Sequence, residues 1–196
     1  CMVVMFMKKI INKIAFLLMI MVISGIFGFL YETAFYRIDL GYFVKRGTTF
    51  GPWIPIYAFG GLFIYFICRK INKNPFLVFL LSMIVCGLLE FITGYFLFKL
   101  ENIRLWDYNT EILNFGNIGG FICLRSILFF SFSGLLLMYV VIPLINKFKS
   151  KLGVKFNYLG ITLGIIFLLD FSAIFLCLAE FIAIILYHHL AKKSSQ

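Results

Sequence analysis

The stretch PFLVFLLSMIVCGLLEFITGYFLF, residues 75–98, contains one charged side chain, Glu90, in an otherwise apolar run. A helix needs roughly 20 mostly apolar residues to cross the hydrocarbon core of a bilayer. Hydrophobic residues make up 63% of the whole chain and charged residues only 13%, a balance that no water-soluble core of this length needs. The stretch therefore predicts a membrane-spanning helix in an integral membrane protein.

Four further apolar runs surround this one, near residues 14–36, 52–68, 121–145 and 158–187. We predict an all-α fold, a polytopic transmembrane helix bundle of about five spans, in a single integral membrane domain over residues 1–196. The run at 52–68 is the shortest. It could be broken or partly re-entrant, because two prolines lie in its first turn and two glycines at its middle.

The net charge of +10 comes from Lys and Arg residues in short loops between the predicted spans. This placement indicates membrane topology rather than a nucleic-acid partner. More of these residues lie on the side of the N-terminus, in the segments around Lys8, Lys70 and Lys149, than on the opposite side. The positive-inside rule therefore predicts a cytoplasmic N-terminus in a multi-pass protein of the cell membrane.

Ionisable side chains inside a span are costly, about 2.5 to 3.5 kcal/mol each on insertion scales, and they commonly mark a functional path. Five are found here: Glu32, Glu90, Arg125, Asp170 and Glu180. With the N-terminus inside, all except Asp170 fall in the outer half of the membrane. We expect Arg125 to pair with Glu32 or Glu90. These groups predict either a polar cavity open to the outside or ion pairs that only hold helices together.

The segment FVKRGTTFGPWIPIYAFGG, residues 43–61, concentrates charge, proline and glycine in an apolar chain. We expect a turn followed by Pro52 at the first helical position, with Pro55 in the next turn. The N–H groups of this helix start, beside the positive charge of Arg46, would attract an anion. That anion could be the carboxylate or phosphate of a ligand, or Glu32 or Glu90, since Arg46 could reach into the membrane.

A weak internal similarity relates two parts of the chain. In both, a Glu late in a span is followed by a polar loop and then by a Gly pair, Glu32 before Gly60 and Glu90 before Gly119. A duplication of this kind would make the first two pairs of spans parallel hairpins. Chance similarity is the alternative explanation.

Motifs of several enzyme classes are absent from the sequence: HExxH, GxSxG and the P-loop GxxxxGK[ST]. The histidines, His188 and His189, lie in the polar C-terminal tail, and the cysteines form no CxxC pair. We therefore predict no metal site, no cofactor and no catalytic residue, although enzymatic activity through paired carboxylates stays open.

Several motifs in order resemble a known family: Tyr31-Glu32, Arg46-Gly47, GPWIPIY at 51–57, LLEFITGY at 88–95, LWDYN at 105–109 and NFGNIGG at 114–120. Over about residues 20–145 the chain is similar to the small bacterial membrane proteins of the Putative ABC-transporter type IV (CmpB-like) family. The resemblance implies a permease-like subunit in the bacterial cytoplasmic membrane. It supplies motif positions without established roles.

Together, the motif positions and the intramembrane charges define the candidate ligand-binding residues. They are Glu32, Arg46, Gly47, Gly51, Pro52, Pro55, Tyr57, Glu90, Trp106, Asp107, Tyr108, Asn114 and Arg125.

Three functions are compatible with these observations. The first is a transporter subunit that handles an anionic or lipid-like ligand at an outward-facing site, with a separate ATPase subunit as partner. The second is a membrane-embedded enzyme or lipid-binding protein that uses paired carboxylates such as Glu32 and Glu90. The third is an accessory or assembly protein whose buried charges are structural. The inner connections near 69–74 and 146–157 leave little room for a helix that engages an ATPase.

Overall fold

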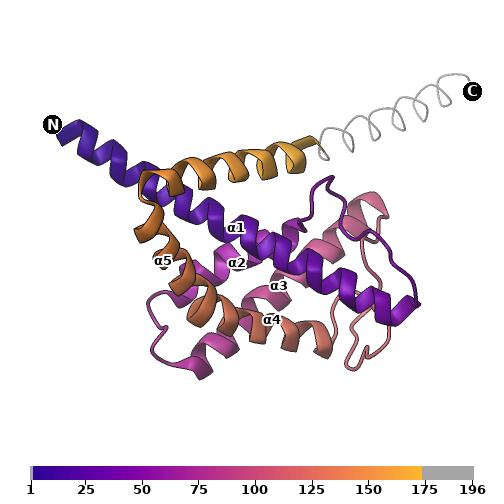
Figure 1. Ribbon diagram of the computed structural model, residues 1–196. Helices are drawn as coiled ribbons and strands as arrows, with labels where there is room; N and C mark the ends of the chain where they lie inside the picture. Colours follow the sequence, from indigo (N-terminus) through magenta and orange to yellow (C-terminus); the bar gives the residue numbers. More distant parts are fainter. Residues whose placement is uncertain (1, 174–196) are drawn as a thin grey trace, which may run out of the picture.

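The computed structural model describes residues 2–173, and in this part of the chain every regular element is a helix (Figure 1). A long first helix is followed by three further rods and a last helix. They are α1 (Met2–Leu40), α2 (Pro55–Cys68), α3 (Pro75–Glu101), the continuous rod of α4 (Leu124–Leu136), the π-helical turn η1 (Leu137–Val141) and α5 (Ile142–Leu152), and the helix Val154–Ala173. The prediction of an all-α membrane bundle is confirmed. Glu180 and the two histidines lie outside the described residues.

Four of these rods are long and apolar enough to cross a bilayer: Met2–Leu40, Pro75–Leu100, Leu124–Leu152 and Val154–Ala173. They cover the predicted spans at 14–36, 75–98, 121–145 and the described part of 158–187. Helix α2 has only 14 residues, about 21 Å at 1.5 Å per residue. The helix alone is therefore shorter than the hydrocarbon core.

The second helix begins later than the sequence predicts, and the expectation that Pro52 opens it was wrong. Pro55 occupies the start of α2, with Ile54 as the N-cap in an extended conformation. Thr49 Oγ1 donates to the carbonyl oxygen of Trp53 at 2.5 Å, and the N–H of Ile54 donates to the carbonyl oxygen of Gly25 at 3.0 Å. These bonds hold residues 49–54 as a loop beside α1, where protein groups satisfy its backbone.

Helix α2 packs antiparallel against α1 at close range because small residues line the contact. An added Cβ on Gly28 would lie 2.1 Å from Cγ of Tyr57, and one on Gly61 would lie 2.1 Å from Oγ of Ser24. Substitution of either glycine would therefore push the two helices apart. The α3–α4 contact uses the same device, with Gly134 against Ser82.

The last helix runs parallel to α1. Asn157 Nδ2 donates to Oδ1 of Asn12 at 2.5 Å, and a Cβ on Gly160 would lie 2.7 Å from the carbonyl oxygen of Ala15. One turn further on, Gly164 meets Leu18. The GxxxG pair thus forms the surface that lets this helix approach α1.

The two polar loops, residues 41–54 and 102–123, lie at the same end of the bundle, near the C-terminal end of α1 (Figure 1). The longer loop folds into a cap. Within it, the N–H of Tyr108 donates to the carbonyl oxygen of Gly120 at 3.1 Å, and Ile118 and Ile122 form an isolated bridge. Where the cap meets α1, the N–H of Ile112 donates to Asp39 at 3.2 Å.

Candidate functional site

A polar pocket of about 460 Å³, including its open mouth, lies between the two polar loops and the helix ends next to them. Helices α1, α2, α3 and α4, the first loop and the cap all contribute to its wall. The lining residues are Tyr31, Glu32, Phe35, Tyr36, Arg46, Ile56, Tyr57, Glu90, Trp106, Tyr108, Glu111, Arg125, Ser126, Phe129 and Phe130. The structure therefore brings Glu32, Glu90 and Arg125 together in one pocket.

Glu32 pairs with an arginine from the first loop. Nε of Arg46 donates to Oε2 of Glu32 at 3.1 Å, and both side chains are about one-fifth exposed, at 20% and 19%. The guanidinium of Arg46 also lies over the ring of Tyr36, 3.7 Å from its centroid. Arg46 thus reaches down from the loop to α1, as the sequence suggested.

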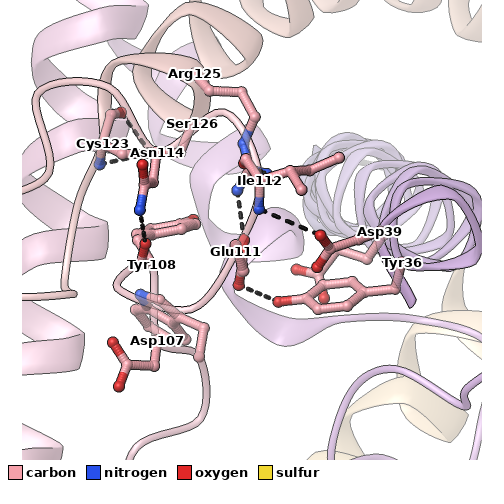
Figure 2. Close-up of polar contacts among 12 residues, drawn as sticks. Tyr36, Asp39, Asp107, Tyr108, Glu111, Ile112, Asn114, Cys123, Arg125 and Ser126 are labelled. Carbon is pink, nitrogen blue, oxygen red and sulfur yellow. Dashed lines mark hydrogen bonds and ion pairs between the residues drawn. The ribbon is translucent and has the colours of Figure 1, made fainter.

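Arg125 does not pair with Glu32 or Glu90, and this expectation is corrected by the fold of the cap. Its Nη2 lies 2.5 Å from Oε2 of Glu111, a residue that the sequence analysis did not single out. The hydroxyl of Tyr36 donates to the other oxygen of Glu111, so the carboxylate lies between α1 and α4 (Figure 2). The guanidinium also donates to the carbonyl oxygen of Ile112 at 3.1 Å and lies over the ring of Phe35.

Glu90 is the most deeply buried carboxyl of the pocket, with only 3% of its surface exposed. The hydroxyl of Tyr108 donates to its Oε1, and Oγ of Ser126 lies 2.8 Å from its Oε2. Within residues 2–173, neither a lysine nor an arginine forms an ion pair with it. Burial, and then the neighbouring Glu90, raise the pKa of Tyr108 well above its ordinary value, so the hydroxyl keeps its proton for this bond.

The charges of the pocket do not balance when every group is ionised. Its wall carries three carboxyl groups and two guanidinium groups, and each guanidinium already pairs with a carboxylate of its own, Arg46 with Glu32 and Arg125 with Glu111. Among the described residues, Glu90 has hydroxyl partners only. The site therefore has a carboxyl that can take a proton or a cation.

Similarity to known proteins agrees with the architecture. A family model, described as Putative ABC-transporter type IV, matches residues 16–175. The chain belongs to this family. The match extends beyond the expected region at 20–145 and includes α5 and the last helix. No curated protein and no solved structure matches the chain.

In this member of the Putative ABC-transporter type IV family, the corner before α2 binds a carboxylate that neither Glu32 nor Glu90 supplies. Asp170, on the last helix, accepts hydrogen bonds from the N–H groups of Phe50 at 3.0 Å and Gly51 at 2.7 Å. The indole Nε1 of Trp53 donates to it at 2.8 Å. The segment before α2 thus binds a carboxylate of the protein itself, through N–H groups that precede Pro52 and the indole of Trp53.

The other motif positions of this family member fall into two groups. Tyr57, Trp106 and Tyr108 line the pocket. Asn114 lies outside the lining and helps to position Tyr108, because its Nδ2 donates to the carbonyl oxygen of Tyr108 at 2.9 Å (Figure 2). The remaining positions lie outside the pocket lining, Pro55 at the start of α2 and the others in the loops: Gly47, Gly51, Pro52 and Asp107.

For two of these loop positions, the local structure explains the residue type. Gly47 has φ of 82°, a conformation that favours glycine. Asp107 pairs with Arg104 at 3.2 Å on the exposed side of the cap. Both residues therefore fold the loops and do not reach the pocket.

Three polar residues of the pocket were not singled out from the sequence: Tyr36, Glu111 and Ser126. An acidic residue directly before the apolar pair Ile112-Leu113 in a loop was the one available signal for Glu111. For Ser126 the signal was its place three residues after the N-cap Cys123, where its Oγ accepts from the Cys123 N–H at 3.3 Å.

Proposed function

We propose that this protein is the membrane subunit of a transporter and that the polar pocket is its ligand site, facing the outer side of the cell membrane. The observation that carries the proposal is the convergence of Glu32, Glu90, Glu111, Arg46 and Arg125 on one pocket between the helices of an apolar chain. Ionisable groups at membrane depth are costly and commonly mark the path of a substrate or ion. Membership of a family described as ABC-transporter type IV supports the same function.

A separate ATPase is the partner that this function requires, because the chain carries no P-loop. The sequence suggested little room for it between residues 146 and 157. In the structure, α5 extends the α4 rod to Leu152 as an 11-residue helix with Lys147, Lys149 and Lys151. This basic helix, on the predicted cytoplasmic side, is the surface at which we expect the ATPase to dock.

An accessory or assembly role is the second candidate, and one observation favours it. Two of the three carboxylates in the pocket already pair with arginines that cross between elements. Such pairs also hold helices and loops together without any ligand. In that role, Glu90 would be a buried acid bound only by Tyr108 and Ser126.

Purification from the native membrane in mild detergent, followed by mass spectrometry of every bound protein, separates the two. A stoichiometric ATPase that is lost when Lys147 and Lys151 are replaced by Glu supports the transporter. Retention of that ATPase by a Glu32→Gln, Glu90→Gln variant would show that docking and ligand site are independent. A wild-type protein that emerges without any ATPase, although it is folded, favours the accessory role.

A further inference from the structure

A second cavity lies directly below the polar pocket and is almost wholly apolar. It measures about 450 Å³ including its mouth. Helices α1, α2, α3, α4 and η1 surround it. Its wall is formed by Ile23, Ser24, Phe27, Tyr57, Gly60, Gly61, Ile64, Cys86, Phe130, Ser133, Leu136, Leu137 and Val141.

The two cavities share part of their wall. Tyr57 and Phe130 line both of them, so the polar and apolar spaces adjoin across these two rings. Small residues keep the lower space open: outside its own helix, an added Cβ on Gly60 would meet only Sγ of Cys86, at 3.5 Å, among the described atoms within 4 Å. A polar cavity next to an apolar one is complementary to an amphiphile, a molecule with a polar head and a hydrocarbon tail.

The side chains of the polar pocket indicate which head group such an amphiphile would carry. Glu90 lacks a cationic partner within residues 2–173. The single hydrogen of Ser126 is shared between Glu90 and the carbonyl oxygen of Cys123, both 2.8 Å from its Oγ. When the serine bonds to Cys123, one oxygen of Glu90 has no donor. A positively charged N–H donor supplies both the charge and the hydrogen that the carboxylate lacks.

Aromatic rings surround the same space. Eight of the lining residues are aromatic, among them Tyr31, Tyr57, Trp106 and Phe129. Ring faces attract cations, most strongly where water is excluded. An aromatic lining around a carboxyl that forms no ion pair within residues 2–173 is therefore complementary to an ammonium group.

We propose that the two cavities form one site for an amphiphile from the surrounding bilayer, with its ammonium head at Glu90 and its hydrocarbon tail in the apolar cavity. This inference rests on the proposed function, because it names the ligand class of that same pocket. Of the two ligand classes that the sequence suggested, anionic and lipid-like, it selects the lipid-like one and gives it a cationic or zwitterionic head.

The test compares two lipids that differ in this feature. Phosphatidylethanolamine carries an ammonium group and phosphatidylglycerol carries a neutral glycerol at the same phosphate. The purified, delipidated protein is incubated with an equimolar mixture of the two, and the bound lipids are counted by native mass spectrometry. We expect one phosphatidylethanolamine to be retained with a preference on the order of tenfold, which corresponds to about 1.4 kcal/mol.

Variants address each half of the site. Glu90→Gln should abolish the preference between the two lipids, whereas Arg104→Gln, on the exposed face of the cap, should leave it unchanged. Gly60→Leu should fill the apolar cavity and reduce binding of both lipids, whereas Gly60→Ala should not. If Gly60→Leu fails to fold, Ser133→Phe fills the same cavity from α4.

Several outcomes would overturn the inference. They are equal binding of both lipids by the wild type, an unchanged preference in Glu90→Gln, or undiminished binding in a folded Gly60→Leu or Ser133→Phe variant. These outcomes can be told apart from failure of the proposed function. If an ATPase co-purifies with a protein that lacks the lipid preference, the transporter proposal is supported and the amphiphile proposal is wrong. If the protein shows the lipid preference but no ATPase co-purifies, the amphiphile proposal is supported and the transporter proposal is wrong.

Discussion

The backbone N–H of Gly51 donates a 2.7 Å hydrogen bond to the carboxylate of Asp170, which lies 119 residues later in the chain. The bond joins the loop before α2 to the last helix. The same loop carries Arg46, whose guanidinium pairs with Glu32 in the polar pocket. Asp170 thus helps to fix the position of a pocket residue that it does not touch.

Replacement of Asp170 by Asn should loosen this loop. The amide has one acceptor oxygen in place of two, so at least one of the three donors loses its partner. Because hydrogen bonds to charged groups contribute about 1.5 to 3 kcal/mol each, we expect a loss of about 2 kcal/mol in the free energy of unfolding. The buried thiols of Cys68, Cys86 and Cys123 allow unfolding in detergent to be followed with a thiol-reactive dye.

Ser172→Ala is the matched control for this measurement. Ser172 lies on the same helix, and among residues 2–173 its hydroxyl donates only to the carbonyl oxygen of Leu169, at 2.9 Å. The melting temperature of the Ser172→Ala protein should stay close to that of the wild type. An Asp170→Asn protein that melts with the control would mean that the loop is held by its other contacts.

The Arg125–Glu111 pair should show strong coupling in a double-mutant cycle. The two side chains are 15% and 4% exposed, and removal of one member of a buried pair costs about 3 to 5 kcal/mol because the other charge is left uncompensated. We expect each of Glu111→Gln and Arg125→Gln to lower the free energy of unfolding by about this amount. The double variant should cost far less than their sum.

The exposed pair Arg104–Asp107 provides the comparison. Its side chains are 30% and 33% exposed, and exposed pairs contribute roughly 0 to 1 kcal/mol. A cycle on Arg104 and Asp107 should therefore give a coupling energy well below that of Arg125 and Glu111. Equal coupling in the two cycles would contradict the burial of Glu111 between the cap, α1 and α4.

The helices could be predicted from the sequence because hydrophobicity over about 20 residues is a local property. The start of α2 could not, because it depends on a contact distant in sequence, between the N–H of Ile54 and the carbonyl oxygen of Gly25. The choice of Pro55 rather than Pro52 follows from that contact. Either proline is compatible with a first helical turn on sequence grounds alone.

The sequence predicted which charged residues line the pocket better than it predicted which residues pair with one another. Intramembrane charge singled out Glu32, Glu90 and Arg125, and the structure brings all three to one wall. The partners of Glu90 and Arg125, Tyr108 and Glu111, depend on how the cap folds over α1, and no local pattern encodes that. The fold places Glu111, from the cap, against Arg125, and it brings Asp170 to the N–H groups of the loop before α2.

Tyr108 should make stability depend on alkaline pH. Burial, followed by the charge of Glu90, raises its pKa well above the ordinary value of 10.0. Below pH 10 the proton is bound in both the folded and the unfolded state. As the pH rises above 10, the unfolded chain loses the proton while the folded protein retains it, so the stability contributed by the neutral hydroxyl is progressively lost.

The measurement is the free energy of unfolding of the wild type and of Tyr108→Phe between pH 8 and pH 11, in the same detergent. The wild type should lose stability more steeply above about pH 10, since the variant lacks this ionisation. Parallel curves for the two proteins would show that Tyr108 is exposed to solvent.

The two ends of the bundle should lie on opposite sides of the membrane, with the cap outside. Thr110, on the cap, and Ser150, beside the lysines of α5, are both exposed. In intact cells a membrane-impermeant maleimide should label Thr110→Cys but not Ser150→Cys, which should react only after permeabilisation. The opposite pattern would reverse the predicted orientation, and the unsubstituted protein measures the background labelling.

The contact between α1 and the last helix should be sensitive to a single methyl group. A Cβ on Gly160 would lie 2.7 Å from the carbonyl oxygen of Ala15, and one on Gly164 would lie 2.6 Å from Cβ of Leu18. These distances force the helices apart, so Gly160→Ala and Gly164→Ala should each cost about 1 to 3 kcal/mol by overpacking. In the same assay Gly60→Ala should be neutral or stabilising, because its Cβ would meet only Sγ of Cys86 at an ordinary 3.5 Å and alanine favours the helix by about 1 kcal/mol. If all three variants melt alike, the last helix does not pack on α1 through its glycines.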